Sequence, residues 1–62
     1  MGANMYYKEN DIVYFLKNRG IIQFKGKDYM IVFFSKISKL GIFNLNGSLK
    51  FWRTNDKRKK KL

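Results

Sequence analysis

The fold is decided by residues 41–53, GIFNLNGSLKFWR, in which the dipeptide Asn46-Gly47 separates two runs of alternating apolar and polar residues. Asn-Gly in this setting is the strongest short-range signal for a β-hairpin. A two-residue turn would set Phe43 opposite Lys50 and so mix apolar and polar side chains on both faces. The alternation therefore favours a loop one residue longer, or a β-bulge at the turn.

With the longer loop, Phe43 pairs with Phe51 on the inner face, and Ile42 and Trp52 pair on the outer face, where Trp52 lies beside Lys50. We therefore predict that Trp52 is at least partly exposed and contacts a partner. An exposed indole ring would offer a stacking platform for unpaired bases. The competing interpretation is that Trp52 caps the end of the core.

Upstream of this hairpin, the sequence predicts a second one. Residues 21–25 alternate and end at a turn over 26–28, and residues 29–34, YMIVFF, are apolar on both faces, as in a central strand. Residues 35–40 form a polar connection. These runs predict that the chain continues as an antiparallel meander.

The first run, residues 11–16 (DIVYFL), has two interpretations. Its β-branched and aromatic residues favour a strand, with a turn over 17–20. Asn10 or Asp11 as N-cap and Gly20 after the last turn would instead favour a helix. We favour the strand because Ile, Val, Tyr and Phe all lose rotamer freedom in a helix.

We therefore predict an all-β fold, a small antiparallel SH3-like barrel or meander of four to five strands. The alternative is an α+β fold, with a helix over residues 11–19 packed on a four-stranded antiparallel sheet. Residues 1–10 are predicted to be a polar N-terminal lead-in, 11–54 a single compact domain, and 55–62 a basic flexible tail.

Part of this order resembles known small barrels at the level of the fold. The elements Asp11-x-Val13, Arg19-Gly20-x-Ile22 and Gly26-x-x-Tyr29-x-Ile31-Val32 resemble SH3-like barrels of the KOW and Tudor kind, over roughly residues 10–53. The resemblance implies a first strand that leads through a turn into a meander. The segment 24–27, FKGK, before an apolar strand is also similar to single-stranded-DNA-binding transcriptional coactivators, although no long helix is predicted after the fourth strand.

Composition narrows the chemistry that this chain can perform. The 62 residues include no Cys and no His, which excludes disulfides and the usual zinc ligand sets, and we expect no metal or other cofactor. Only four carboxylates are present, and no spacing suggests a catalytic base or nucleophile, so we predict that the protein is not an enzyme. A core of this size gives marginal stability, which homo-oligomerisation would raise.

The location follows from what the sequence lacks. No signal peptide is recognisable, and the longest apolar runs, 12–16 and 29–34, reach five and six residues, against about 20 for a membrane span. We expect a soluble cytoplasmic protein without a membrane partner. Its richness in Lys, Asn, Ile and Phe is typical of AT-rich genomes, including those of viruses and mobile elements.

Charge is the strongest functional signal. The chain carries a net charge of +10, and subtracting the five cations of its last six residues still leaves +5. A partner with a dense negative surface is implied, and nucleic acid, DNA or RNA, is the commonest one. We predict largely sequence-tolerant binding, with Lys and Arg contacting the backbone. The predicted contacts are Lys25, Lys27, Lys50, Trp52, Arg53, Lys57, Arg58, Lys59, Lys60 and Lys61, and Lys36 and Lys39 of the connection are further candidates.

The alternative function is that of a protein-interaction module. A small viral or mobile-element regulator or inhibitor would dock on an acidic partner surface, with exposed aromatic side chains as hot spots and lysines for steering. Its sequence features overlap with those of a nucleic-acid-binding protein.

Overall fold

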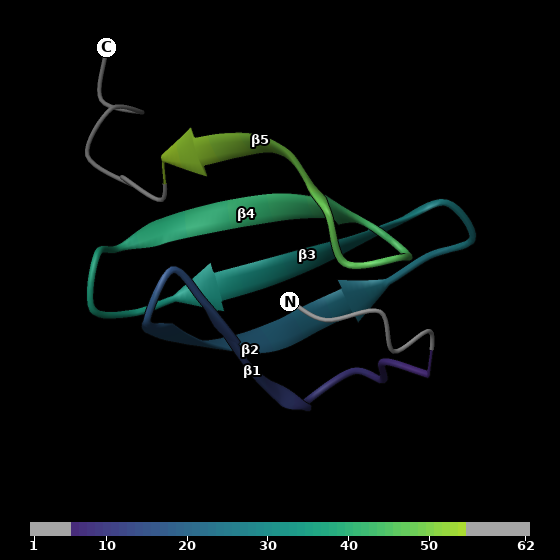
Figure 1. Ribbon diagram of the computed structural model, residues 1–62, viewed down its shortest axis with the longest axis horizontal. Helices are drawn as coiled ribbons and strands as arrows, with labels where there is room; N and C mark the ends of the chain where they lie inside the picture. Colours follow the sequence, from purple (N-terminus) through teal and green to yellow (C-terminus); the bar gives the residue numbers. More distant parts are fainter. Residues whose placement is uncertain (1–5, 55–62) are drawn as a thin grey trace, which may run out of the picture.

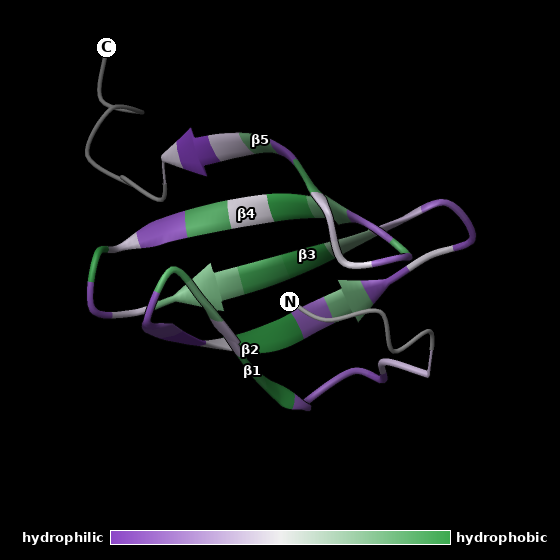
Figure 2. Cartoon of the chain, in the orientation of Figure 1, coloured by the Kyte–Doolittle hydropathy of each residue, from purple (hydrophilic) through white to green (hydrophobic). Residues whose placement is uncertain are grey.

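A computed structural model describes residues 6–54, which form a single sheet of five antiparallel strands and no helix. The strands are β1 (Ile12–Phe15), β2 (Asn18–Lys25), β3 (Tyr29–Phe34), β4 (Lys39–Asn44) and β5 (Leu49–Thr54). They lie side by side in chain order, and β1 runs diagonally across β2 in the view of Figure 1. Figure 2 shows that β3 is hydrophobic from its middle to its end, as expected for the central strand.

The all-β prediction is confirmed, as an open meander. The alternative helix over residues 11–19 is wrong, because Ile12–Phe15 form β1 and pair with residues 18–21 of β2. The β-branched and aromatic residues of this run therefore outweigh the two capping residues at its ends. The finer prediction of an SH3-like barrel is not confirmed, since the order β1-β2-β3-β4-β5 leaves β1 and β5 as the two unpaired edges of the sheet.

The core lies on one face of the sheet, which we call the inner face. Its largest side chains without exposed surface are Phe34, Phe43, Ile22, Met30 and Val32. Two glycines, on the two strands that flank β3, make room for the aromatic rings. A Cβ added at Gly20 would lie 2.6 Å from Phe34 Cε1, and one added at Gly41 would lie 2.6 Å from Phe43 Cε1.

The segment before β1 packs against the sheet. Tyr7 is buried and belongs to the core cluster. The backbone N–H of Asn10 donates to the carbonyl oxygen of Ile22 at 2.7 Å, and Glu9 Oε2 accepts from the backbone N–H of Lys25 at 3.2 Å. Packing of the described chain therefore begins before the first strand.

The last hairpin has a different register from the one predicted. Phe43 pairs with Leu49 and Ile42 with Phe51, so that Lys50 is the extra residue of a β-bulge. The predicted pairing of Phe43 with Phe51 is wrong, and Trp52 pairs with Gly41. The bulge is present, but it lies within β5 and places Trp52 on the inner face. The indole is accommodated there because its partner is a glycine.

Candidate nucleic-acid interface

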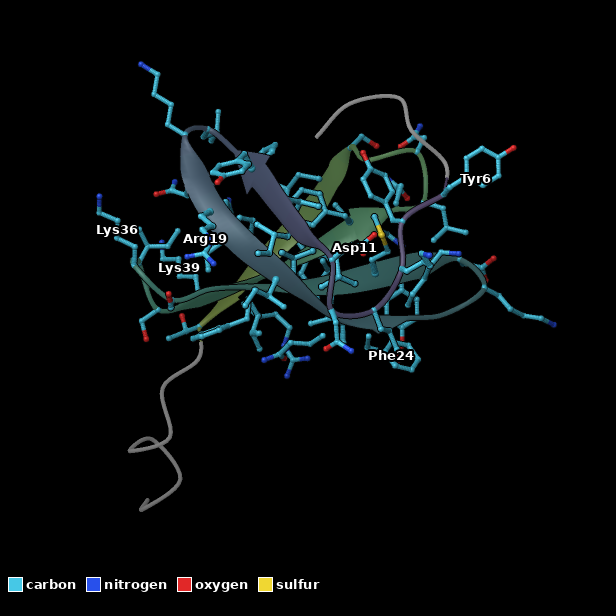
Figure 3. All side chains as sticks on the ribbon, turned by 90° about the horizontal axis from the view of Figure 1, so that it is seen from below. Tyr6, Asp11, Arg19, Phe24, Lys36 and Lys39 are labelled. Atoms are coloured by element: carbon cyan, nitrogen blue, oxygen red, sulfur yellow. The ribbon has the colours of Figure 1, made fainter. Side chains whose placement is uncertain are left out.

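Alternate turns of a meander lie at the same end of the sheet, and this arrangement gathers positive charge. The β1–β2 turn, the β3–β4 turn and the last residues of β5 share one end, which we call the cationic end. Figure 3 shows Arg19, Lys36 and Lys39 together there. Within residues 6–54, this end carries Lys17, Arg19, Lys36, Lys39 and Arg53.

None of the three carboxylates in the described residues lies at the cationic end. Glu9 and Asp28 are at the opposite end, beside the last residue of β2 and in the β2–β3 turn. Asp11 precedes β1, where its carbonyl oxygen accepts from the backbone N–H of Ile22 in the middle of β2. The charge of the described chain is therefore polarised along the strands.

A hollow of about 370 Å³ opens at the cationic end on the outer face, the side of the sheet away from the core. Two cross-strand pairs shape it, because Tyr14 lies opposite Arg19 and Ile21 lies opposite Phe33. The flanking turns add two lysines and a serine. The complete lining is Tyr14, Lys17, Arg19, Ile21, Phe33, Ser35 and Lys36.

The β1–β2 turn that presents Lys17 has a demanding backbone conformation. Its two central residues, Leu16 and Lys17, both have positive φ, 52° and 67°. Positive φ at both central positions is the type I′ geometry, which matches the twist of a two-residue hairpin but favours Asn and Gly. The turn is therefore tight, and it sets Lys17 on the rim of the hollow.

The hollow combines groups that suit a phosphate-bearing ligand with an apolar part. A guanidinium binds phosphate with two parallel N–H donors, and an ammonium contributes a point charge. No carboxylate of residues 6–54 stands at this end to neutralise Lys17, Arg19 or Lys36. The rings of Tyr14 and Phe33 supply the apolar part of its wall.

The structure separates the residues that the sequence predicted as contacts. Lys25 and Lys27 lie at the end of β2 and in the turn after it, at the opposite end from Arg53. Lys50 is the bulge residue of β5. The predicted contacts Lys57, Arg58, Lys59, Lys60 and Lys61 lie outside the described residues.

Trp52 is half-buried on the inner face, so its ring is not part of the hollow. Its ring centroid lies 6.0 Å from that of Phe15 and 5.6 Å from that of Phe34. The ammonium of Lys39 lies 5.9 Å from the centre of the indole, within reach of a cation–π interaction.

Sequence reasoning missed Lys17 and Arg19, which it assigned only to a turn. Counting strands could have found them, because in any five-stranded meander the first and third turns share an end with the last residue of the last strand. Residues 16–19, residues 35–39 and Arg53 meet by that rule. The prediction of these two contacts therefore required only the order of the strands in the sheet, and no sequence motif.

Comparison with protein-family models, with curated proteins and with solved structures found no match to this chain. Within residues 6–54, no helix has the length and apolar character of a membrane span. No three side chains of the metal-binding types gather anywhere in that described part.

Proposed function

We propose that the protein binds nucleic acid through the cationic end, by contacts to the phosphate backbone that tolerate any sequence. The observation that supports this proposal is the polarised charge: the cationic end carries five cations and no carboxylate of the described chain, and three of these cations line the hollow. Such a field attracts a polyanion, and release of its condensed counterions supplies the free energy.

We propose that the C-terminal cations contribute to the same interface. Thr54, the last residue of β5, lies at the cationic end, and Lys57 follows it by three residues. In this proposal the block from Lys57 to Lys61 contacts phosphates next to those held by the hollow.

The experiment compares two variants that lose the same charge at opposite ends of the sheet. One carries Lys17→Gln, Arg19→Gln and Lys36→Gln, and the control carries Lys8→Gln, Lys25→Gln and Lys27→Gln. Affinity for a fluorescein-labelled 20-nucleotide strand is measured by anisotropy over a range of salt concentrations. Each lost phosphate contact lowers the slope of log affinity against log salt by about 0.7 to 0.9.

We expect the cationic-end variant to lose two to three contacts by this slope, about 1.4 to 2.7 in all, and the control to keep nearly the wild-type slope. Equal loss in both variants would contradict the proposed interface, since it would show a response to net charge alone. Loss of all binding by the wild type at about 0.15 M salt would favour the alternative of an acidic protein partner.

A further inference from the structure

Two β-bulges in the described residues each turn a phenylalanine to the outer face. In β2 the register shifts between Ile22 and Phe24, which leaves Gln23 as the extra residue. In β5 the extra residue is Lys50, just before Phe51. Without these bulges, strict alternation would place Phe24 on the inner face with Ile22, and Phe51 there with Leu49.

Both phenylalanines lie in a single cross-strand row, Phe24–Ile31–Ile42–Phe51, which we call the outer row. The rings at its two ends are 42% and 52% exposed, whereas Ile42 between them is buried. Three strand spacings separate the ends of the row, about 14 Å. The outer row therefore has an exposed phenylalanine ring at each end and two isoleucine side chains between them.

The outer row continues into the hollow at the cationic end. Ile31 and Phe33 are two residues apart on β3 and so share the outer face. Phe33 lines the hollow together with Ile21, its cross-strand partner. One apolar surface thus runs from the exposed rings to the cations.

Exposure of these rings indicates a ligand that covers them. A chain of this size gains stability from every apolar side chain that it buries. The bulge at Gln23 nevertheless leaves Phe24 exposed, and the bulge at Lys50 leaves Phe51 exposed while it brings Trp52 to the inner face. Bulges are over-represented next to functional sites, where they re-aim a side chain. An exposed apolar patch on a small soluble protein typically marks a site of interaction.

The cations beside the outer row indicate which kind of ligand this surface binds. Lys50 directly precedes Phe51, and Arg53 follows it on the same face. The partner must therefore offer flat apolar groups and dense negative charge together, as the bases and phosphates of an unpaired strand do. A second copy of this chain would instead bring another net charge of +10 to the same surface.

We infer that the outer face binds single-stranded nucleic acid, with bases stacked on Phe24 and Phe51 and with the phosphates directed toward the hollow. This inference rests on the proposed function, which it deepens by naming an unpaired strand as the ligand. Duplex is disfavoured because its bases are stacked on one another and cannot reach the rings.

The test replaces the two rings without removing charge. In one double variant, Phe24→Leu with Phe51→Leu, apolar volume remains but stacking is lost. In the matched variant, Phe24→Tyr with Phe51→Tyr, the rings remain. Leu16→Asn serves as a control, since it removes an exposed apolar side chain outside the outer row. The probes are labelled dT12 and a DNA hairpin duplex with the same number of phosphates, at 0.1 M salt.

We expect the wild type to prefer dT12 over the duplex, and the leucine variant to bind dT12 at least about tenfold more weakly, since each stacked base contributes about 5- to 150-fold. The tyrosine variant and Leu16→Asn should stay within about twofold of the wild type. The salt slope of the leucine variant should not change, because it keeps every cation. Circular dichroism checks that each variant remains folded.

Several results would overturn the inference and leave the proposed function standing. These are equal binding of duplex and dT12, or wild-type affinity of the leucine variant while the cationic-end variant binds weakly. Self-association that the leucine variant abolishes, in sedimentation without nucleic acid, would also overturn it by making the outer row an interface between copies. If the wild type bound neither probe, the proposed function itself would be contradicted.

Discussion

Phe15 of β1 and Trp52 of β5 pack ring against ring, with centroids 6.0 Å apart, although they come from the two unpaired edge strands of the sheet. Phe34 contacts both rings from the central strand. The backbone of the sheet is open, but its inner face is closed by these side chains. Aromatic contacts of this kind stabilise by more than their buried area alone.

Trp52→Ala should therefore destabilise the protein rather than weaken a ligand contact. Removing a packed indole costs about 3 kcal/mol or more, a large fraction of the stability of so small a domain. Urea unfolding followed by circular dichroism measures the loss. Phe51→Ala is the control, because the ring of this neighbour lies on the outer face and is half-exposed. A larger loss for Phe51→Ala than for Trp52→Ala would restore the register predicted from the sequence.

The register of the β4–β5 hairpin could not be predicted from the alternation of apolar and polar residues. Leu49, Phe51 and the intervening Lys50 alternate perfectly, so a period of two places both apolar residues inside. The structure breaks this alternation because a bulge at Lys50 lets Trp52 occupy the space above Gly41. The deciding contact joins residues on different strands, and no single run of sequence contains it.

The strands themselves were predictable because their composition is local. Residues 29–34 are apolar at every position, and only a central strand covered on one face and half-covered on the other accommodates them. The cationic end could have been predicted, because alternate turns of a meander lie at the same end of the sheet. The exposure of Phe24 could not, because it depends on a bulge at Gln23 that alternation does not predict.

Gly20→Ala should destabilise the fold through a clash on the inner face. The new Cβ would lie 2.6 Å from Phe34 Cε1 and 2.7 Å from Val32 Cγ1, and both of these side chains are fully buried. Forcing such a contact in a packed core costs about 1 to 3 kcal/mol. The loss is measured as a lower midpoint of thermal unfolding.

Gly26→Ala provides the matched control for that substitution. Its nearest contact would be Phe24 Cε2 at 3.0 Å, and the Phe24 ring is exposed and can move aside. We expect a change of less than about 0.5 kcal/mol. Similar losses at both glycines would mean that the space under Phe34 does not determine the effect.

Leu16→Asn should stabilise the protein. Leu16 has a φ of 52° at the tip of the β1–β2 hairpin, where its side chain is 72% exposed. A left-handed conformation costs an ordinary residue about 1 to 2 kcal/mol, and Asn tolerates it better. A gain of about 0.5 kcal/mol corresponds to a rise of roughly 2 to 4 °C in Tm.

Ile37→Asn separates this backbone effect from the loss of an exposed apolar side chain. Ile37 lies in the β3–β4 turn and is also exposed, but it is not among the residues with positive φ. Its substitution should leave Tm unchanged or slightly lower. An equal rise in both variants would show that the turn conformation at Leu16 carries no strain.

Removal of residues 57–62 tests whether the C-terminal cations bind phosphate beside the cationic end. The truncation deletes five cations and leaves a net charge of +5. If each contacts one phosphate, the slope of log affinity against log salt should flatten by up to about 4. Since the tail and the hollow are proposed to contact the same strand, truncation in the Lys17→Gln, Arg19→Gln, Lys36→Gln background should flatten the slope further, toward zero. An unchanged slope after truncation of the wild type would mean that these residues only keep the protein soluble, and the phosphate contacts would then belong to the hollow alone.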